Sequence, residues 1–275
     1  MGDAVGTFSE NTTLSKSMWD VLFVDLADPR TSSWFLMDNP LPVIGILIIY
    51  LYSVKVMIPN YMATRKPYNL KTTIMIYNIF QVIFNIILFR EAWLMWIRYN
   101  WFCQDFDRSN SPRAMRDTVA AYLYFLNKIS DLTDTFFFTL RKKNNQVTFL
   151  HIYHHSLMPM IGWIMVKYVP GGHITFVGLL NTFVHVILYG YYFLAGLGPE
   201  MQKYLWWKKY LTKLQLLQFL LVILHNLLLF FGDCGFPKWT LFLILPNTVL
   251  FYYLFNDFYN KNYIKPKHDV QNKKK

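Results

Sequence analysis

The sequence predicts an all-α integral membrane protein with seven transmembrane helices. Of its 275 residues, 54% are hydrophobic and 19% are aromatic, and several apolar runs are too long and too uninterrupted for a soluble core. A hydrocarbon layer about 30 Å thick requires roughly 20 apolar residues in each spanning helix. Seven such runs occupy most of the chain, so we expect one helical domain and no soluble catalytic module.

The seven runs follow one another with short polar connections. Pro40 opens the first run, Pro67 separates the first two, and Gly171 and Gly172 precede the fifth. The expected organisation is an N-terminal segment (1–38), a seven-helix domain (39–260) and a basic tail (261–275). The expected helices span residues 40–58, 73–97, 118–140, 146–168, 174–195, 210–231 and 239–259.

Charged residues predict which side of the membrane each end occupies. Lysine and arginine are concentrated after the first, third, fifth and seventh runs, which makes those segments cytosolic. The first 38 residues contain six acidic residues against Lys16 and Arg30. We therefore expect a lumenal N-terminus and a cytosolic C-terminus. The net charge of +11 reflects this sidedness, so we do not expect nucleic-acid binding.

The expected lumenal side carries two sites of covalent modification. Asn11 begins an Asn-Thr-Thr sequon, and its predicted position permits glycosylation. Cys103 follows the second run and Cys234 follows the sixth, so both cysteines fall on the same side. An oxidising compartment permits a disulfide between them, and two unpaired thiols are the alternative.

Polar side chains inside the apolar runs predict the functional site, because ionisable and amide groups are costly in hydrocarbon. They share one face of each helix and one layer, roughly 8 to 20 Å below the cytosolic surface at about 1.5 Å per residue. This common depth predicts a single polar cavity that opens toward the cytosol. The layer contains Lys128, Asp131 and Asp134 in the third run, His151, His154 and His155 in the fourth, Asn181 and His185 in the fifth, and Gln215 and Gln218 in the sixth.

Single members of this layer also have structural interpretations. Lys128 and Asp131 can neutralise each other at i, i+3, and a lone His185 or glutamine is an ordinary interhelical hydrogen-bonding group. Three histidines on one helical face instead indicate metal binding, proton transfer or nucleophilic chemistry.

A metal site is the first of these to consider. The His-x-x-His-His pattern occurs in membrane di-iron enzymes, which use about eight histidine ligands. This chain has seven histidines, and His173 and His268 lie outside the expected bundle. A di-iron centre is therefore poorly supplied with ligands, and we expect no metal, although a mononuclear site stays open.

The motifs of this layer resemble those of the very-long-chain fatty acid elongases, which are condensing enzymes of the endoplasmic reticulum. That family has Lys-x-x-Glu-x-x-Asp-Thr, His-x-x-His-His, Asn-x-x-x-His with a following Tyr, and Thr-x-x-Gln-x-x-Gln. The resemblance extends from about Asp28 to Tyr263; Asp131 replaces the usual Glu, and Leu188 stands where Met is usual. The matching residues are Lys128, Asp131, Asp134, Thr135, His151, His154, His155, Asn181, His185, Tyr189, Thr212, Gln215 and Gln218.

The resemblance implies a 3-ketoacyl-CoA synthase of the endoplasmic reticulum membrane, which condenses a long-chain acyl-CoA with malonyl-CoA, releases CO2 and needs no cofactor. Soluble condensing enzymes use a cysteine nucleophile, and this chain has no cysteine in the expected cavity. His154 is the candidate nucleophile of a ping-pong acyl transfer, oriented by His151, His155 and Asp134. A mechanism in which a histidine acts only as a base predicts the same residues.

The other residues of the layer are assigned to the reaction or to substrate binding. Asn181 and His185 are expected to stabilise an enolate or oxyanion, and Lys128 and Asp131 complete the candidate catalytic set. The acyl chain is expected in a central tunnel between the helices, and basic residues at the cytosolic surface attract CoA phosphates. The candidate substrate-binding residues are Tyr189, Thr212, Gln215, Gln218, Arg141, Lys142, Lys143, Lys208 and Lys209.

The resemblance also implies partners, and two other classes of protein stay open. The partners are the lipid bilayer, the 3-ketoacyl-CoA reductase, 3-hydroxyacyl-CoA dehydratase and enoyl-CoA reductase of the elongation cycle, and a possible second copy of the chain. One alternative is a histidine-dependent metal desaturase or hydroxylase. The other is a seven-helix receptor or transporter. The polar layer argues against a receptor, because it is expected near the cytosolic surface, whereas receptor ligand sites usually open outward.

Overall fold

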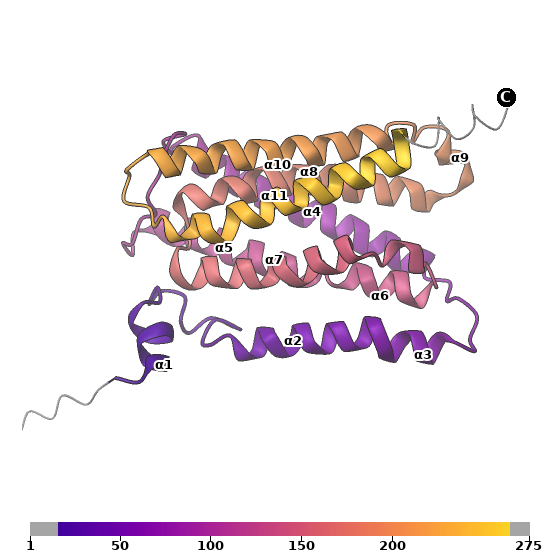
Figure 1. Ribbon diagram of the computed structural model, residues 1–275, viewed down its shortest axis with the longest axis horizontal. Helices are drawn as coiled ribbons and strands as arrows, with labels where there is room; N and C mark the ends of the chain where they lie inside the picture. The colour runs from indigo at the N-terminus through magenta and orange to yellow at the C-terminus, as the bar shows by residue number, and fades with distance from the viewer. Residues whose placement is uncertain (1–15, 265–275) are drawn as a thin grey trace, which may run out of the picture.

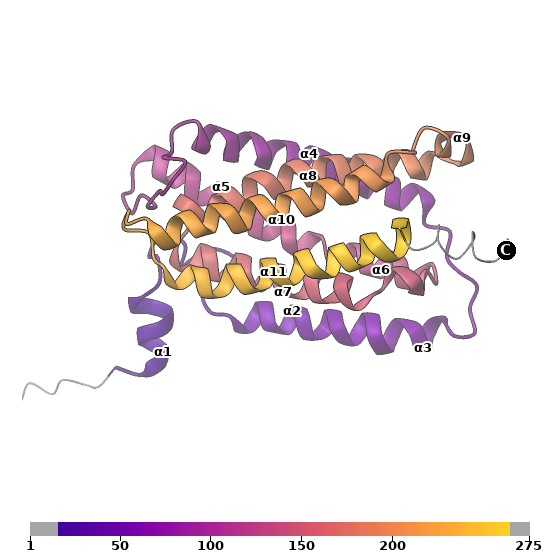
Figure 2. The same cartoon turned by 45° about the horizontal axis from the view of Figure 1, so that its top comes forward.

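The computed structural model describes residues 16–264, and in this range the chain is all-helical, with no strand. The long helices run side by side along the longest axis of the molecule (Figure 1), and a view turned by 45° shows the same arrangement (Figure 2). The expected sequon at Asn11 and the tail from residue 265 lie outside the described residues. The α-helices are α1 (Met18–Asp20), α2 (Leu41–Tyr52), α3 (Ile58–Met62), α4 (Lys71–Trp96), α5 (Pro112–Ser130), α6 (Thr133–Leu140), α7 (Phe149–Tyr168), α8 (Thr175–Leu197), α9 (Pro199–Gln202), α10 (Lys208–Phe231) and α11 (Trp239–Tyr259).

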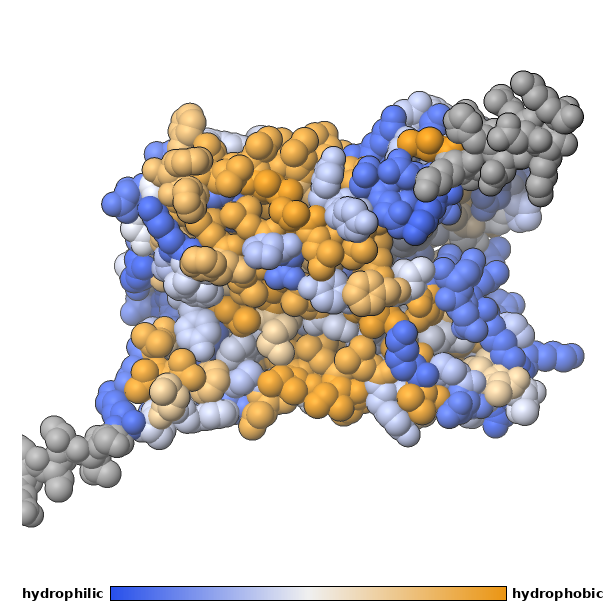
Figure 3. Space-filling model, viewed as in Figure 1, coloured by the Kyte–Doolittle hydropathy of each residue, from blue (hydrophilic) through white to orange (hydrophobic). Residues whose placement is uncertain are grey.

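Five helical segments are long and apolar enough to cross a membrane. Their outward side chains give the molecule a broad hydrophobic surface, with hydrophilic residues gathered toward the two ends (Figure 3). The chain is therefore a multi-pass membrane protein. The five segments are Leu41–Met62, Lys71–Trp96, Gly172–Leu197, Lys208–Phe231 and Trp239–Ile264.

Two further long helical units are not among these five segments. One consists of α5 followed by α6, and the other is α7. Both carry polar side chains within their length, such as Lys128 in α5 and His154 in α7. These two helices pack against each other inside the bundle. Their lower hydropathy therefore follows from the residues that they supply to the interior.

The third expected helix, 118–140, is interrupted in the structure. It begins earlier, at Pro112, and ends at Ser130, and α6 starts again at Thr133. Across the break the backbone N–H groups of Asp134 and Thr135 bond to carbonyls three residues earlier, at 3.3 Å in both cases. This tightening from an α-helical to a 3₁₀ pattern was not expected, because neither proline nor glycine occurs there.

The other expected helices agree with the structure to within a few residues at most ends. The last helix continues through a π-helical turn to Ile264, beyond its expected end at residue 259, and the first, which was expected to end at residue 58, is also longer. There α2 continues through a π-helical turn, Ser53–Met57, into α3 and ends at Met62. In α7, Pro159 has no N–H group, so the carbonyl of His155 lacks its usual intrahelical donor.

Three pairs of neighbouring helices build the bundle. α4 packs along α8, α5 along α7, and α10 along α11. Buried side chains of α7, α10 and α11, including Met165, Val222 and Ile244, form one hydrophobic cluster. A second cluster joins α2 to α5 and α7 through Tyr50 and Phe125. α7 thus lies between the two halves of the interior.

Loops close one end of the bundle, which we call the disulfide end. The structure joins Cys103, after α4, to Cys234, after α10, in a disulfide. Gly172 has φ +65°, and a Cβ at this position would lie 2.7 Å from the backbone nitrogen of Phe106. Only glycine accepts both the backbone conformation and the close approach. The connection from α7 to α8 is therefore pressed against the loop that carries Cys103.

Candidate active site

Lys128 is the centre of a buried polar cluster between α5 and α8. Its ammonium group donates to Asp131 Oδ2 at 2.7 Å and to Asn181 Oδ1 at 3.1 Å, and lies 3.5 Å from His185 Nδ1. The lysine side chain is 1% exposed. An ammonium has three protons, so these three groups account for all of them. The expected pairing of Lys128 with Asp131 is present, and it also fixes two residues of α8.

Tyr189 and Gln81 complete the hydrogen bonding of the carboxylates. The Tyr189 hydroxyl lies 2.8 Å from Asp134 Oδ2 and 3.0 Å from Asp131 Oδ1. The amide nitrogen of Gln81, on α4, donates to Asp131 Oδ1 at 3.0 Å. A phenol has a single proton, so at any moment it serves one of the two carboxyl groups. Three helices therefore hold the two acidic side chains.

The three histidines of α7 lie at the start of that helix and contact different neighbours. His151 Nε2 is 2.8 Å from the hydroxyl of Thr135, and its ring centroid is 4.1 Å from that of His155. His154 lies edge-on to Phe251 of α11, with ring centroids 5.0 Å apart. We expected Asp134 to hold a histidine, but Asp134 bonds Tyr189 instead, because the break before α6 turns it toward α8 and Thr135 toward α7.

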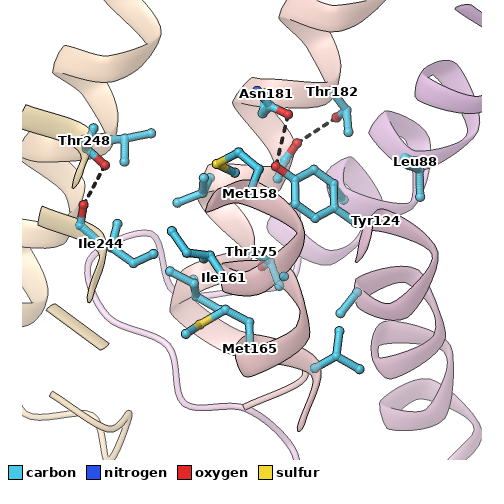
Figure 4. Close-up of a pocket in the computed structure, with 18 of the residues that line it drawn as sticks. Leu88, Tyr124, Met158, Ile161, Met165, Thr175, Asn181, Thr182, Ile244 and Thr248 are labelled. Carbon is cyan, nitrogen blue, oxygen red and sulfur yellow. Dashed lines mark hydrogen bonds between the residues drawn. The ribbon is translucent and has the colours of Figure 1, made fainter. Parts of the chain in front are cut away.

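An apolar cavity lies beside this cluster, and His154 and Asn181 stand on its wall. The empty space between its lining atoms, including the part that is open to solvent, is about 1070 Å³. Figure 4 shows Tyr124, Met158, Ile161 and Met165 around it, from α5 and α7. Most of the wall is aliphatic or aromatic, so the cavity suits a hydrocarbon ligand with one polar group.

Asn181 lines this cavity, and two hydrogen bonds fix the orientation of its side-chain amide. Its side-chain oxygen accepts from the Tyr124 hydroxyl at 3.0 Å, drawn in Figure 4, and from Lys128 at 3.1 Å. With the oxygen used twice, the two N–H protons of the amide remain for a ligand. The cluster around Lys128 thus orients a donor of the kind that stabilises a developing oxyanion.

The remaining predicted residues of the bundle lie around the cavity or behind it. Gln218 is on the cavity wall, whereas Gln215 and Thr212 of α10 are not among its lining residues. His185 and Tyr189 are buried behind Asn181 and reach the site through Lys128 and the carboxylates. Of the eight candidate catalytic residues, His154 and Asn181 alone line the cavity.

The predicted basic residues lie at the end of the bundle opposite the disulfide, which we call the basic end (Figure 1). They flank the start of α7 and the start of α10, and hydrophilic side chains gather there in Figure 3. Lys142 Nζ donates to the carbonyl of Ala63 at 3.3 Å, so that side chain also ties the loop to α3. The set comprises Arg141, Lys142, Lys143, Lys208 and Lys209.

Several residues of the site were not predicted from the sequence. Gln81 and Tyr77 of α4 bond to each other at 2.8 Å behind Asp131, Tyr124 holds Asn181, and Tyr50 of α2 bonds Thr135 at 2.8 Å. Gln81 and Asn85 are amides inside an apolar run. Because amide groups are costly in hydrocarbon, their positions in the sequence could have identified them as candidate site residues. The tyrosines gave no comparable signal, because their rings also suit membrane interfaces.

An apolar cavity with one histidine and one oriented amide, inside a multi-pass helical bundle, is typical of membrane enzymes that act on apolar substrates. Comparison with known sequences gives the family. Residues 35–271 match the ELO family, described as the GNS1/SUR4 family. The chain belongs to this family.

Curated relatives match over most of their length. Very long chain fatty acid elongase 7 of Drosophila melanogaster is 46% identical over 250 residues, which is 90% of this chain and 76% of that protein. Elongase 7 of Rattus norvegicus is 44% identical over 263 residues, covering 94% and 93%. Elongase 4 of Homo sapiens is 43% identical over 244 residues, covering 88% and 77%. The range matched by the family, 35–271, contains every residue of the candidate site.

Proposed function

We propose that this protein is the condensing enzyme of fatty acid elongation, which joins a long-chain acyl-CoA to malonyl-CoA and gives a 3-ketoacyl-CoA two carbons longer, CO2 and CoA. The names of the relatives support fatty acid elongation as the class of activity. The observation that carries the chemistry is the pair His154 and Asn181 on the wall of a mostly apolar cavity. No cofactor takes part in the proposed reaction.

In the first half-reaction, a ring nitrogen of neutral His154 attacks the thioester carbonyl. The C–S bond breaks, CoA leaves, the imidazole proton goes to the departing sulfur, and the acyl group stays on the nitrogen. The carbonyl oxygen becomes negative during the attack, and the N–H protons of Asn181 stabilise it. The apolar wall keeps water from the reactive acyl-imidazole.

In the second half-reaction, malonyl-CoA loses CO2, and the electron pair of the broken C–C bond forms an enolate. Its carbon attacks the acyl carbonyl, the C–N bond to His154 breaks, and the released imidazole nitrogen takes up one proton from solvent, which restores neutral His154 as 3-ketoacyl-CoA leaves. Lys128, Asp131 and His185 act as positioning residues for Asn181 rather than by touching substrate. Their contacts of 2.7 to 3.8 Å support this role.

The proposed topology has seven spans, with α5–α6 and α7 added to the five apolar segments. The N-terminus is lumenal and the C-terminus cytosolic, in the membrane of the endoplasmic reticulum. The concentration of lysine and arginine at the basic end supports this orientation. The same residues, Arg141 to Lys143 with Lys208 and Lys209, would bind the CoA phosphates, while the acyl chain enters the cavity. The reductases and the dehydratase of the cycle are the proposed partners.

Acyl transfer without malonyl-CoA tests this function directly. Purified protein is incubated with a long saturated acyl-CoA, and free CoA and intact protein mass are measured. We expect one CoA per protein and a mass increase of one acyl group, mapped to His154 and lost in His154→Gln. His173→Gln is the matched control, because His173 bonds the carbonyl of His225 at the disulfide end and a glutamine amide can keep that bond.

Other outcomes distinguish the alternatives. CO2 release on addition of malonyl-CoA without an acyl adduct would retain the condensing enzyme and replace the covalent step by direct base-assisted condensation. Bound iron in folded protein, together with no turnover of any chain length, would favour the metal-dependent desaturase or hydroxylase. Ligand binding without turnover would favour a receptor or transporter.

A further inference from the structure

A chain of hydroxyl groups connects α2 to the first histidine of α7. The Tyr50 hydroxyl of α2 lies 2.8 Å from Thr135 Oγ1 of α6, and Thr135 Oγ1 lies 2.8 Å from His151 Nε2. Tyr50 and Thr135 are 2% and 0% exposed. Water therefore does not compete at the two hydroxyl groups, and their protons must be arranged among the three side chains themselves.

Counting donors fixes the direction of the chain. Within residues 16–264, Thr135 is the one hydrogen-bond partner of the Tyr50 hydroxyl. If His151 Nε2 carried a proton, it would donate to Thr135, and Thr135 would then either donate to Tyr50 or accept from it; in both cases one buried hydroxyl proton would have no acceptor. A buried unpaired donor is costly. In the opposite direction Tyr50 donates to Thr135 and Thr135 donates to Nε2, so every hydroxyl proton has an acceptor.

We propose that Tyr50 and Thr135 form a hydroxyl relay that keeps His151 neutral, with its proton on Nδ1 and its Nε2 lone pair held by Thr135. Both are positioning residues, because neither lines the cavity. A second proton on His151 would have to enter at Nε2 and reverse both hydroxyls. The relay therefore opposes formation of an imidazolium next to the other two histidines.

The relay bears on the proposed condensation, and this part of the inference rests on that function. The ring of His151 lies 4.1 Å from that of His155, which in turn lies 5.4 Å from the ring of His154. A positive charge on His151 would disfavour a second positive charge nearby, such as the acyl-imidazolium that forms when the neutral ring of His154 attacks the thioester. Holding His151 neutral and fixed in orientation keeps the three neighbouring rings in their reactive state.

The position of the proton is measured first, without turnover. Protein labelled with 15N-histidine is reconstituted in lipid, and the His151 signals are identified by their loss in His151→Gln. Protonated and unprotonated imidazole nitrogens have well-separated shifts, so the tautomer is read directly rather than inferred from hydrogen-bond geometry. We expect an unprotonated Nε2 in the wild type, and a mixture of tautomers in Tyr50→Phe. A protonated Nε2 in the wild type would overturn the relay.

Kinetics then test what the relay does. We expect Tyr50→Phe and Thr135→Val to lower kcat about 3- to 10-fold with KM for acyl-CoA unchanged, as for the loss of one buried hydrogen bond. Thr135→Ser retains a hydroxyl and should restore the rate. The double variant should equal Thr135→Val alone, because Tyr50 acts only through Thr135. Tyr52→Phe is the matched control, since Tyr52 is exposed on the same helix.

Failure of the relay and failure of the proposed function would give different results. Wild-type protein with the expected tautomer but no condensation activity would sink the proposed function and leave the relay in place. An active wild type whose Tyr50→Phe and Thr135→Val variants keep full kcat would overturn the role of the relay in the reaction. A fall in kcat that merely follows the folded fraction, measured by thermal unfolding of each variant, would do the same.

Discussion

The ion pair of Lys128 and Asp131 permits a quantitative test of the site, in which methionine and asparagine replace the two charges with little change of volume. Lys128→Met removes the ammonium and leaves the Asp131 carboxylate, 2% exposed, with Gln81 and Tyr189 as its remaining donors among residues 16–264. Asp131→Asn instead leaves the buried ammonium without its counter-charge. Each single variant therefore contains one uncompensated charge.

The magnitude follows from burial. Removing one partner of a buried ion pair costs about 3–5 kcal/mol, whereas replacing both by neutral groups is often nearly neutral. A chain of this size loses roughly 2–4 °C in Tm per kcal/mol, so each single variant should unfold roughly 6–20 °C below the wild type. The double variant should recover most of that loss, because the amide oxygen introduced by Asp131→Asn can still accept from Gln81.

The assay is a double-mutant cycle on protein purified in detergent. Thermal unfolding of the wild type, the two single variants and the double variant gives the coupling energy, which we expect to be about 3 kcal/mol or more. Condensation activity should be lost in both single variants and in the double variant, since Lys128 also orients Asn181 at 3.1 Å. Stability recovered without activity separates the two roles of the lysine.

Additive single effects would refute this reasoning. If the double variant unfolds as far below the wild type as the two single variants summed, the two charges do not interact as the 2.7 Å contact requires. A double variant with wild-type activity would instead show that neither charge is needed to hold Asn181.

Three further predictions concern other parts of the molecule. Gly172→Ala should destabilise the protein by about 2 kcal/mol or more, because φ +65° and a contact of 2.7 Å both disfavour a Cβ; a normal unfolding temperature would contradict this. Gly178→Leu should shorten the longest product in an acyl-CoA assay, because Gly178 lines the cavity, whereas Gly190→Leu, with nothing within 4 Å of its added Cβ, should leave the product profile unchanged. Cys103→Ser should lower thermal stability, by up to about 5 kcal/mol for a closed loop of 131 residues, and equal stability with and without reductant would count against that loop constraint.

Much of the helical framework could be predicted because it depends on long apolar runs. Helices α4, α8, α10 and α11 begin and end within about three residues of the expected positions. The break before α6 could not be predicted, because Asp131 and Leu132 are not helix-breaking residues. At the break Asp131 accepts from Gln81 of α4 and from Lys128 three residues earlier in the chain, and the contact with α4 cannot be read from the local sequence.

The sequence predicted many of the residues that form the candidate site, but it did not predict which side chains contact each other. Spacing placed Lys128, Asp131 and Asp134 on one face, and these residues do converge on α8. Spacing does not predict which neighbour each side chain contacts. Adjacent residues of a helix point in directions about 100° apart, so a small rotation of the helix changes which residue faces a given neighbour. For that reason Thr135 rather than Asp134 reaches His151, and the contribution of Tyr50 from α2 was not foreseen.

The contacts at the disulfide end also set an order of events during biosynthesis. The loop that carries Cys103 covers Gly172 and supplies the carbonyl of Gln104 to the N–H of His173. Its covalent partner, Cys234, lies 131 residues further along the chain. A ribosome must therefore complete α10 before this wall of the cavity can be locked. Until then the nascent protein contains its histidines, but the loop that carries Cys103 is not yet tied to the segment after α10.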